Sequence, residues 1–428
     1  MKILLSGIAA LLCITAAAAP VRLEQDASGN WRLFADGKPF QVRGVGRFDQ
    51  PELARRCGVN TLRTYSSNDP ERALREMDAA QRSGFKVIRG IWLQRESKNF
   101  SYKNPVHLQE QRENIRRQVR ALRHHPALLC WGLGNEAEGP RTTELHPEYW
   151  KELNILAGIL KEEDPDHPVM NVIAGNAVWK MKAIKELAPA IDIIGINTYA
   201  GAVISAKRLD EAGWQGPWML TEFGPRGHWE VPQTAWGVPL EPGGKAKADN
   251  YERGYRAAVA DAKRCLGMIA FVWSSKQEVT GTWYGMFLET GEKTPAVDRI
   301  AKLYSGKPLP NRSPNIDRIV CGLDRKKVAP GQTFQARAFI IDPENDPVTC
   351  EWKVIRESGV KWAEGNREPV PPTIEGCFPA GNTGGEVTVV TPEKPGAYRL
   401  FLFVRDGQGG GTSCNLPFLV EQNDKKKI

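Results

Sequence analysis

From Gln41 to Tyr304 the hydrophobic pattern alternates between short, almost continuous apolar runs and longer runs of helical period. Such apolar runs are expected of strands that are buried on both faces of a parallel sheet. The eight predicted strands are Gln41–Gly46, Thr61–Tyr65, Lys86–Ile91, Leu128–Leu133, Val169–Ala174, Ile191–Asn197, Trp218–Thr221 and Gly267–Phe271. Eight strands alternating with helices over about 260 residues predict a (β/α)8 TIM barrel. The competing α/β fold, a doubly wound open sheet, would need a glycine-rich phosphate turn after a strand, and none is clear.

Local signals support the helices and the segment before the barrel. Asp69-Pro70 is a helix N-cap followed by proline, and residues 107–124 and 150–163 have an amphipathic helical pattern. Residues 20–40 predict a β-hairpin that closes the bottom of the barrel. Its alternating runs flank a turn at residues 26–30, and Asp36-Gly37 marks a second turn.

The helical period disappears after Tyr304. Residues 305–315 form a linker rich in Pro, Asn and Ser. Residues 316–428 contain short alternating runs separated by turns such as Pro330-Gly331 and Asp406-Gly407. This pattern predicts an immunoglobulin-like β-sandwich. The chain is therefore expected to be an α/β protein with a (β/α)8 barrel over residues 41–304 and a C-terminal sandwich.

Residues 1–19 are typical of a signal peptide, with Lys2 before an apolar run and Ala17-Ala18-Ala19 before Pro20. The alternatives are an uncleaved anchor or lipid attachment at Cys13, although Leu12 is bulky for the latter. No other segment has the length and hydrophobicity of a membrane span. We therefore expect a secreted or periplasmic protein whose mature chain does not span the membrane.

The chain of 428 residues has a formal net charge of +8, dispersed over many predicted helices apart from the tail Lys425-Lys426-Lys427. A dispersed charge is typical of a solvated surface, and export argues further against a nucleic-acid partner. Only a loose association with an acidic cell envelope is expected.

Cysteine spacing gives no zinc signature, and no metal or organic cofactor is predicted. Cys57, Cys130 and Cys265 fall in or beside predicted barrel elements and are expected to be buried apolar residues. Cys321, Cys350, Cys377 and Cys414 lie in the predicted sandwich. Four cysteines in an exported domain permit up to two disulfides, whose pairing cannot be deduced from sequence.

Two of the apolar runs finish on a glutamate, Glu136 and Glu222. Because catalytic residues of such barrels come from the C-terminal ends of the strands, the two carboxylates are expected at the same end. A pair of carboxylates, one as acid/base and one as nucleophile, is what glycoside hydrolysis needs. Other strand ends also offer polar and aromatic side chains, among them Arg63, Trp92, Asn197, Tyr199, Trp273 and Glu278.

The barrel resembles glycoside hydrolase clan A, and most closely the catalytic domain of glycoside hydrolase family 2. Three stretches carry this resemblance. Asn135-Glu136 after His-Pro-Ala-Leu-Leu-Cys-Trp-Gly-Leu-Gly is similar to the family's motif at strand 4. Gly58-Val-Asn-Thr-Leu-Arg63 is similar to its motif at strand 2, and Thr221-Glu222-Phe-Gly to its motif at strand 7.

The resemblance implies that Glu136 is the acid/base and Glu222 the nucleophile of a retaining mechanism. Whatever the family, the acid needs a raised pKa and the nucleophile must stay ionised. Arg63 could supply positive charge beside the nucleophile, and Tyr199 a hydroxyl donor. Asn135 could hydrogen-bond a sugar 2-hydroxyl.

The other substrate-binding candidates are mainly aromatic. Trp273 is predicted to form an apolar platform for a sugar ring, and Trp229 stands on a long loop after strand 7 where it could stack on sugars. Trp92, Asn197 and Glu278 complete the predicted substrate contacts.

The domain layout differs from that of family 2, whose members usually carry sandwiches before the barrel. Three functions therefore stay open: an exported retaining β-glycosidase, a transglycosylase that uses the same glutamates, and a non-catalytic glycan-binding envelope protein. The presence of both glutamates together with Arg63 favours an enzyme. The acidic stretch from Asp342 to Asp346 could bind calcium, but a plain turn is favoured.

Overall fold

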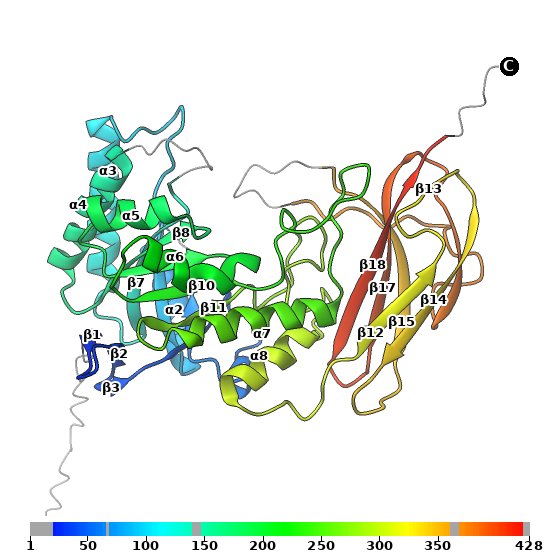
Figure 1. Cartoon of the computed structure of the whole chain (residues 1–428), viewed down its shortest axis with the longest axis horizontal. Helices are drawn as coiled ribbons and strands as arrows, with labels where there is room; N and C mark the ends of the chain where they lie inside the picture. Colours follow the sequence, from blue (N-terminus) through cyan, green and yellow to red (C-terminus); the bar gives the residue numbers. More distant parts are fainter. Residues whose placement is uncertain (1–19, 66–67, 139–146, 360–367, 423–428) are drawn as a thin grey trace, which may run out of the picture.

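The computed structural model describes residues 20–65, 68–138, 147–359 and 368–422. The predicted signal peptide, with Cys13, and the basic tail lie outside these residues. Figure 1 shows a barrel with a three-stranded sheet at its base and a β-sandwich beside it. Among the described residues, no helix combines the length and the apolar character that crossing a bilayer requires.

Eight parallel strands close the barrel in the order β10-β11-β4-β5-β6-β7-β8-β9. This closure confirms the predicted TIM barrel and excludes the open sheet. The strands are β4 Val42–Gly46, β5 Thr61–Arg63, β6 Lys86–Ile91, β7 Leu128–Asn135, β8 Val169–Ala174, β9 Ile193–Asn197, β10 Trp218–Phe223 and β11 Cys265–Ala270. The helices are α1 Pro51–Arg56, α2 Pro70–Arg82, α3 Pro105–Leu122, α4 Pro147–Glu163, α5 Val178–Leu187, α6 Ser205–Glu211, α7 Gly244–Ala260 and α8 Pro295–Ser305, with a 3₁₀ turn, η1, at Ala200–Ile204.

Helix α2 begins where its sequence signal places it, whereas α3 begins at Pro105 and α4 at Pro147, two and three residues before the predicted starts at 107 and 150. The Asp69 side chain accepts hydrogen bonds from the backbone N–H groups of Glu71 and Arg72, and Pro70 occupies the first turn of α2. Asn104 caps α3 in the same way. The apolar faces of these helices pack on the outside of the barrel, where a large buried cluster fills the space between strands and helices.

The predicted N-terminal hairpin is a three-stranded antiparallel sheet of β1 Arg22–Gln25, β2 Trp31–Ala35 and β3 Lys38–Pro39. The second turn, at Asp36 and Gly37, adds the third strand, and both residues have positive φ. Val21 and Leu33 of this segment share a buried cluster with Val42 and Leu129 of the barrel strands. The sheet therefore closes the N-terminal end of the barrel, the end opposite the predicted site.

The C-terminal sandwich consists of one sheet of order β12-β14-β16 and one of order β13-β18-β17-β15. Its strands are β12 Asn315–Cys321, β13 Lys327–Val328, β14 Thr333–Ile341, β15 Thr349–Arg356, β16 Glu386–Val390, β17 Gly396–Arg405 and β18 Gly411–Val420. A separate core forms between the sheets around the fully buried Trp352. Helix α7 reaches from the barrel to the sandwich, where it contacts β12 and β18 (Figure 1).

The cysteines and the acidic stretch have structural explanations. Cys57, Cys130 and Cys265 are buried, as predicted. The four sandwich cysteines are free thiols in this structure, so the two permitted disulfides are not formed. In the acidic stretch, the Asp342 carboxylate accepts the backbone N–H groups of Glu344 and Asp346, as in a plain turn.

Candidate active site

The C-terminal ends of four strands bring the central predicted residues together. Arg63 ends β5, Asn135 ends β7 with Glu136 directly after it, and Asn197 ends β9. Glu222 is the fifth residue of β10. Because all strands of the barrel are parallel, these ends meet at one mouth, and continuous hydrogen bonding links the five side chains.

Glu222 is held from two sides. Arg63 donates to it with 3.0 Å between Nη1 and Oε1, and the Tyr199 hydroxyl donates to Oε2 at 3.0 Å. The Arg63 side chain is only 3% exposed, so this is a buried ion pair. Burial raises the pKa of Tyr199 well above its ordinary value, so the phenol keeps the proton that it donates. The guanidinium of Arg63 also lies over the ring of Tyr65, 4.6 Å from its centroid.

Glu136 is presented on a sharp turn at the end of β7. Gly134 has φ 78°, and Glu136 itself has φ 54°, a left-handed conformation that is uncommon for a residue other than glycine. The backbone N–H of Glu136 donates to Val172 O at 2.9 Å, which fixes the turn against β8. Its side-chain Oε1 accepts a hydrogen bond of 2.8 Å from Asn197 Nδ2.

The surroundings of Glu136 favour its protonated form. Burial, and after it the negative charge of Glu222, raise the pKa of Glu136 to about 7, against the opposing effect of the Asn197 hydrogen bond. A carboxyl group of this kind can hold a proton near neutral pH and release it to a reacting group.

Two amides connect the carboxylates. Asn135 Oδ1 accepts from Arg63 Nη2 at 2.5 Å and from Asn197 Nδ2 at 3.1 Å. Asn197 Oδ1 accepts from Thr221 Oγ1 at 2.9 Å. Asn135, predicted to bind a sugar hydroxyl, and Asn197, predicted to contact substrate, are thus also structural links in the mouth. Thr221 was not among the predicted site residues, although it directly precedes Glu222.

The predicted aromatic contacts divide into exposed and buried rings. Trp92 is 36% exposed and Trp229 is 47% exposed, so both have faces open to a ligand. Trp273, by contrast, is fully buried and packs edge-on against Phe287 with 5.2 Å between centroids. It therefore cannot serve as a sugar platform in this structure, because the loop after β11 folds back over its ring. The sequence shows that residue 273 is a tryptophan, but not whether its ring is exposed to ligand or buried in the protein.

Two further carboxylates near the mouth are paired. Glu278 forms an ion pair with Lys276, whose ammonium lies over the ring of Phe271 at 4.6 Å. Glu138, two residues after Glu136, is buried and accepts from Lys180 Nζ at 2.5 Å and from the backbone N–H of Ala174 at 2.8 Å. The second pair ties the Glu136 turn to the end of β8.

Tyr284, an aromatic residue on the loop after β11, also lies beside the site. Its hydroxyl lies 3.2 Å from both the backbone N and the Nδ1 of His228, and its ring lies 5.5 Å from that of Tyr199. Within the described ranges, no group of three or more His, Cys, Asp or Glu side chains is arranged to hold a metal ion.

The mouth of this TIM barrel holds two carboxylates, the buried Glu222 beside a cation and the partly buried Glu136 with a raised pKa. Such a site is suited to acid/base and nucleophilic chemistry. Residues 60–216 match the family model described as "Glycosyl hydrolases family 2, TIM barrel domain". The predicted resemblance of the barrel to the glycoside hydrolase family 2 catalytic domain is thus confirmed.

Known relatives agree with this relationship. The β-glucuronidases of Homo sapiens and Chlorocebus aethiops are each 28% identical to this chain over 201 residues, which is 42% of this chain and 28% of theirs. The β-glucuronidase of Bacteroides uniformis shares the fold with a TM-score of 0.52 and 16% identity over 94% of this chain and 48% of its own. That of Bifidobacterium dentium has a TM-score of 0.52 and 19% identity over 68% of this chain and 50% of its own. The chain thus spans less than a third of these curated relatives and about half of the solved ones.

Proposed function

We propose that the protein is a retaining glycoside hydrolase that cleaves β-linked O-glycosidic bonds in an oligo- or polysaccharide by a two-glutamate double displacement. The observation that carries this proposal is the difference between the two carboxylates at one mouth. Glu222 is paired with a buried arginine, whereas Glu136 has its pKa raised to about 7. A retaining glycosidase needs such a difference.

In the first step, Glu222 attacks the anomeric carbon while Glu136 donates its proton to the departing glycosidic oxygen. The glycosidic bond breaks, and an ester forms between the sugar and Glu222. Arg63 and Tyr199 hold the attacking carboxylate in one orientation, since each binds a different oxygen of it.

In the second step, Glu136 takes a proton from water, the resulting hydroxide attacks the anomeric carbon, and Glu222 leaves as a carboxylate. The ester removes the negative charge that helps to raise the pKa of Glu136, so that pKa falls when a base is needed. Asn135 and Asn197 lie between the two carboxylates, where a sugar 2-hydroxyl would bind, and Trp92 and Trp229 offer exposed rings to neighbouring sugars.

The first test is covalent labelling of the nucleophile. A structure of Bacteroides uniformis β-glucuronidase 2 is covalently bound to cyclophellitol-6-carboxylate aziridine, so this reagent and its uncharged analogues are suitable probes. Intact-mass and peptide analysis should show a single adduct on Glu222, and the Glu222→Gln variant should stay unlabelled. Hydrolysis with net inversion of configuration at the anomeric carbon would refute the double displacement.

The second test identifies the reaction and the sugar. Residues 20–428 should be incubated with aryl β-glycosides, beginning with a β-glucuronide, and with β-linked polysaccharides, and the products analysed by mass spectrometry. Shortened products that Glu222→Ala abolishes would support a hydrolase, and lengthened products would replace it with a transglycosylase. Binding to a glycan without turnover of any substrate would favour a non-catalytic protein.

The proposal also includes export of the protein. This part is supported by the sequence of residues 1–19 alone. Expression with and without this segment, followed by fractionation and N-terminal sequencing, should place the longer form outside the cytoplasm with Pro20 as its first residue. A longer form that stays uncleaved in the membrane fraction would support an anchor instead.

A further inference from the structure

Two segments of the barrel form a wall beside the nucleophile. The 224–243 loop follows β10 and carries His228 and Trp229, and the 276–284 segment follows β11 and carries Tyr284. The rings of Trp229 and Tyr284 lie 5.8 Å and 5.5 Å from the ring of Tyr199, which donates to Glu222. The positions of these two segments therefore set the surroundings of the nucleophile.

One buried carboxylate, that of Glu241 in the 224–243 loop, holds the two segments together. Its Oε1 accepts from Lys247 Nζ at 2.5 Å and from Thr282 Oγ1 at 2.8 Å. Its Oε2 accepts from Thr280 Oγ1 at 2.8 Å and from Asn415 Nδ2 at 2.6 Å. The side chain is only 2% exposed, so all these contacts are made away from solvent.

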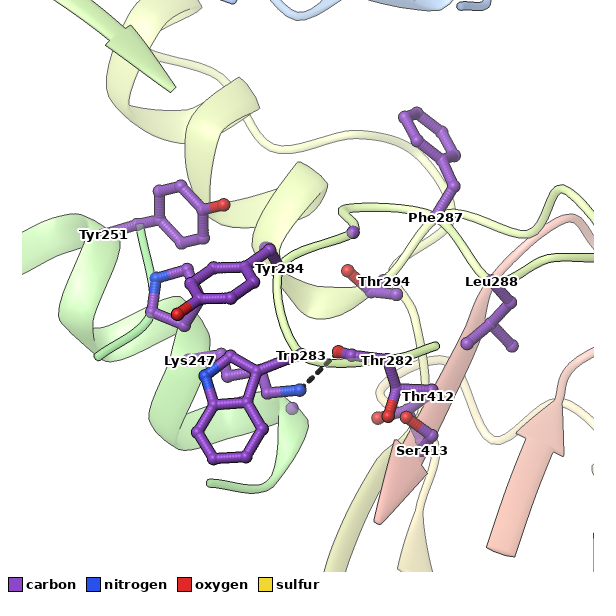
Figure 2. A pocket seen from close by; sticks show the side chains of 14 residues that line it. Lys247, Tyr251, Thr282, Trp283, Tyr284, Phe287, Leu288, Thr294, Thr412 and Ser413 are labelled. Carbon is purple, nitrogen blue, oxygen red and sulfur yellow. Dashed lines mark hydrogen bonds between the residues drawn. The ribbon is translucent and has the colours of Figure 1, made fainter. Parts of the chain in front are cut away.

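The last of those contacts comes from the sandwich. Asn415 lies on β18, and it accepts from Nη1 of Arg399 on β17 at 2.7 Å. Arg399 is buried, and its Nη2 donates to the backbone oxygen of Pro239, in the 224–243 loop, at 2.7 Å. A small cavity beside this junction is lined from both sides, by Lys247 and Thr282 of the barrel and by Thr412 and Ser413 of the sandwich (Figure 2).

The charges of this junction depend on one another. Burial alone would raise the pKa of Glu241, but Lys247 and then Arg399 more than offset it, so the pKa lies below its ordinary value. A buried anion is stable only while its cations and donors are in place. Since one of those cations and one donor belong to the sandwich, the loop conformation depends on the docked sandwich.

A third sandwich residue, after Arg399 and Asn415, also contacts this wall. Glu368 is buried, and its Oε2 accepts the backbone N–H of Val279 at 2.6 Å. Val279 has φ 64°, an unusual conformation for a β-branched residue, and it directly follows Glu278 at the mouth. The contact therefore stabilises a strained position in the 276–284 segment.

We propose that the C-terminal sandwich completes the active site, with Arg399 and Asn415 as positioning residues that act through Glu241 on the 224–243 loop and the 276–284 segment. This inference rests on the proposed glycosidase function for its kinetic part. The two segments that form the wall beside the nucleophile would then be correctly positioned only when the two domains are joined at this junction.

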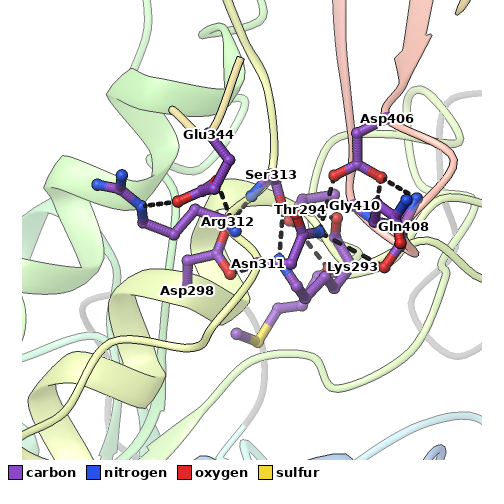
Figure 3. Close-up of polar contacts among 11 residues, drawn as sticks. Lys293, Thr294, Asp298, Asn311, Arg312, Ser313, Glu344, Asp406, Gln408 and Gly410 are labelled. Carbon is purple, nitrogen blue, oxygen red and sulfur yellow. Dashed lines mark hydrogen bonds and ion pairs between the residues drawn. The ribbon is translucent and has the colours of Figure 1, made fainter. Parts of the chain in front are cut away.

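The two domains are also joined through contacts that do not include this wall. Lys293 pairs with Asp298 at 2.6 Å, and Ser313 of the linker binds both of these residues (Figure 3). The backbone N–H of Lys293 donates to Gly409 O, and its backbone oxygen accepts from the N–H of Gly411. Arg405, on the same strand as Arg399, pairs with Glu292 at 3.1 Å and donates to Thr290. None of the contacts described for Arg405 involves the 224–243 loop or the 276–284 segment.

Arg399→Met and Arg405→Met are therefore a matched pair, in which the same substitution removes an interdomain arginine from the same strand. Hydrogen–deuterium exchange of peptides covering 224–243 and 276–284 should be measured without substrate, together with Tm, kcat and KM on one aryl glycoside. We expect Arg399→Met to raise exchange in both segments and to lower kcat/KM by about tenfold to a hundredfold, as a displacement of about 1 Å does. Arg405→Met should lower Tm while leaving exchange in these segments and kcat/KM unchanged.

Equal exchange and equal kinetics in the two variants would overturn the proposal, as would increased exchange without any kinetic change. If Arg399→Met does not fold, Asn415→Leu removes the direct donor to Glu241 at nearly constant volume and should show the same pattern more weakly. The exchange measurement also separates two failures. Wild-type protein without glycosidase activity would refute the proposed function, whereas unchanged exchange in Arg399→Met would refute the coupling.

Discussion

The two glutamates at the barrel mouth are chemically identical, yet their surroundings differ. Glu222 lies within strand β10, with a guanidinium on one oxygen and a phenol on the other. Glu136 lies on a left-handed turn and accepts from a neutral amide, and its neighbours in space include two anions, Glu222 and Glu138. In the proposed mechanism, this difference keeps one carboxylate ready to attack and the other ready to donate a proton.

The largest effect is expected from Glu222→Ala, which removes the attacking group. We expect kcat/KM to fall by about 10⁴-fold or more, as when a nucleophile is removed from other enzymes. Steady-state kinetics on an aryl glycoside would measure this loss. Added azide should restore turnover of the variant by attacking the anomeric carbon in place of Glu222, which gives a glycosyl azide of inverted configuration. Near-normal hydrolysis by Glu222→Ala would show that Glu222 is not the nucleophile.

Glu136→Gln is expected to have a smaller effect that depends on the substrate. Loss of a general acid costs about 10²- to 10⁴-fold, but only where the leaving group needs protonation. We expect a large loss for an alkyl or sugar leaving group and a small loss of the first step for a dinitrophenyl group. Pre-steady-state kinetics on both substrates measures the difference, and equal losses would contradict the acid role.

Arg63→Met tests the cation that distinguishes the two sites. It leaves Glu222 buried without its charged partner, so we expect about a 10²- to 10³-fold loss in kcat/KM together with a lower Tm. The control is Arg89→Met, which removes another buried arginine that pairs with Glu76 on α2. The control should lower Tm but change kcat/KM much less. Equal losses of kcat/KM in the two variants would indicate that Arg63 has only a structural role.

The smallest effect concerns the pH profile. Since Glu136 must be protonated to act as acid and its pKa is raised to about 7, kcat/KM should fall as pH rises above about 7. Negative charge on Glu138 contributes to raising that pKa, so Glu138→Gln should make deprotonation easier and move this limb to lower pH. If the limb stays in place or moves to higher pH, Glu138 stabilises the turn that carries Glu136 but does not raise the pKa of Glu136.

The barrel was predictable because its signals are local. A strand buried on both faces is a nearly continuous apolar run wherever it lies in a parallel sheet, and caps such as Asp69 act on the next few residues. Some predicted strand ends differ from the observed ones by one or two residues. For example, β7 extends to Asn135 and β10 to Phe223. That difference matters little for the site, because polar residues at the ends of parallel strands meet at the same mouth.

Trp273 and Glu241 show where local signals fail. A tryptophan just after a strand has the same sequence pattern whether it faces ligand or, as here, packs against Phe287. Glu241 lies on a loop without a distinctive pattern, and its partner Asn415 is 174 residues away. No periodicity or motif could have indicated that pairing.

The sequence by itself determined which elements form and which residues stand at the strand ends, because hydrophobic period and capping depend on neighbours along the chain. Only the tertiary structure decided how those side chains differ in charge state and exposure. The raised pKa of Glu136, the pairing of Arg63 with Glu222 and the burial of Trp273 all arise from groups brought together from distant segments. Electrostatic energies depend on distance in space and on exclusion of water, and neither is fixed by separation along the chain.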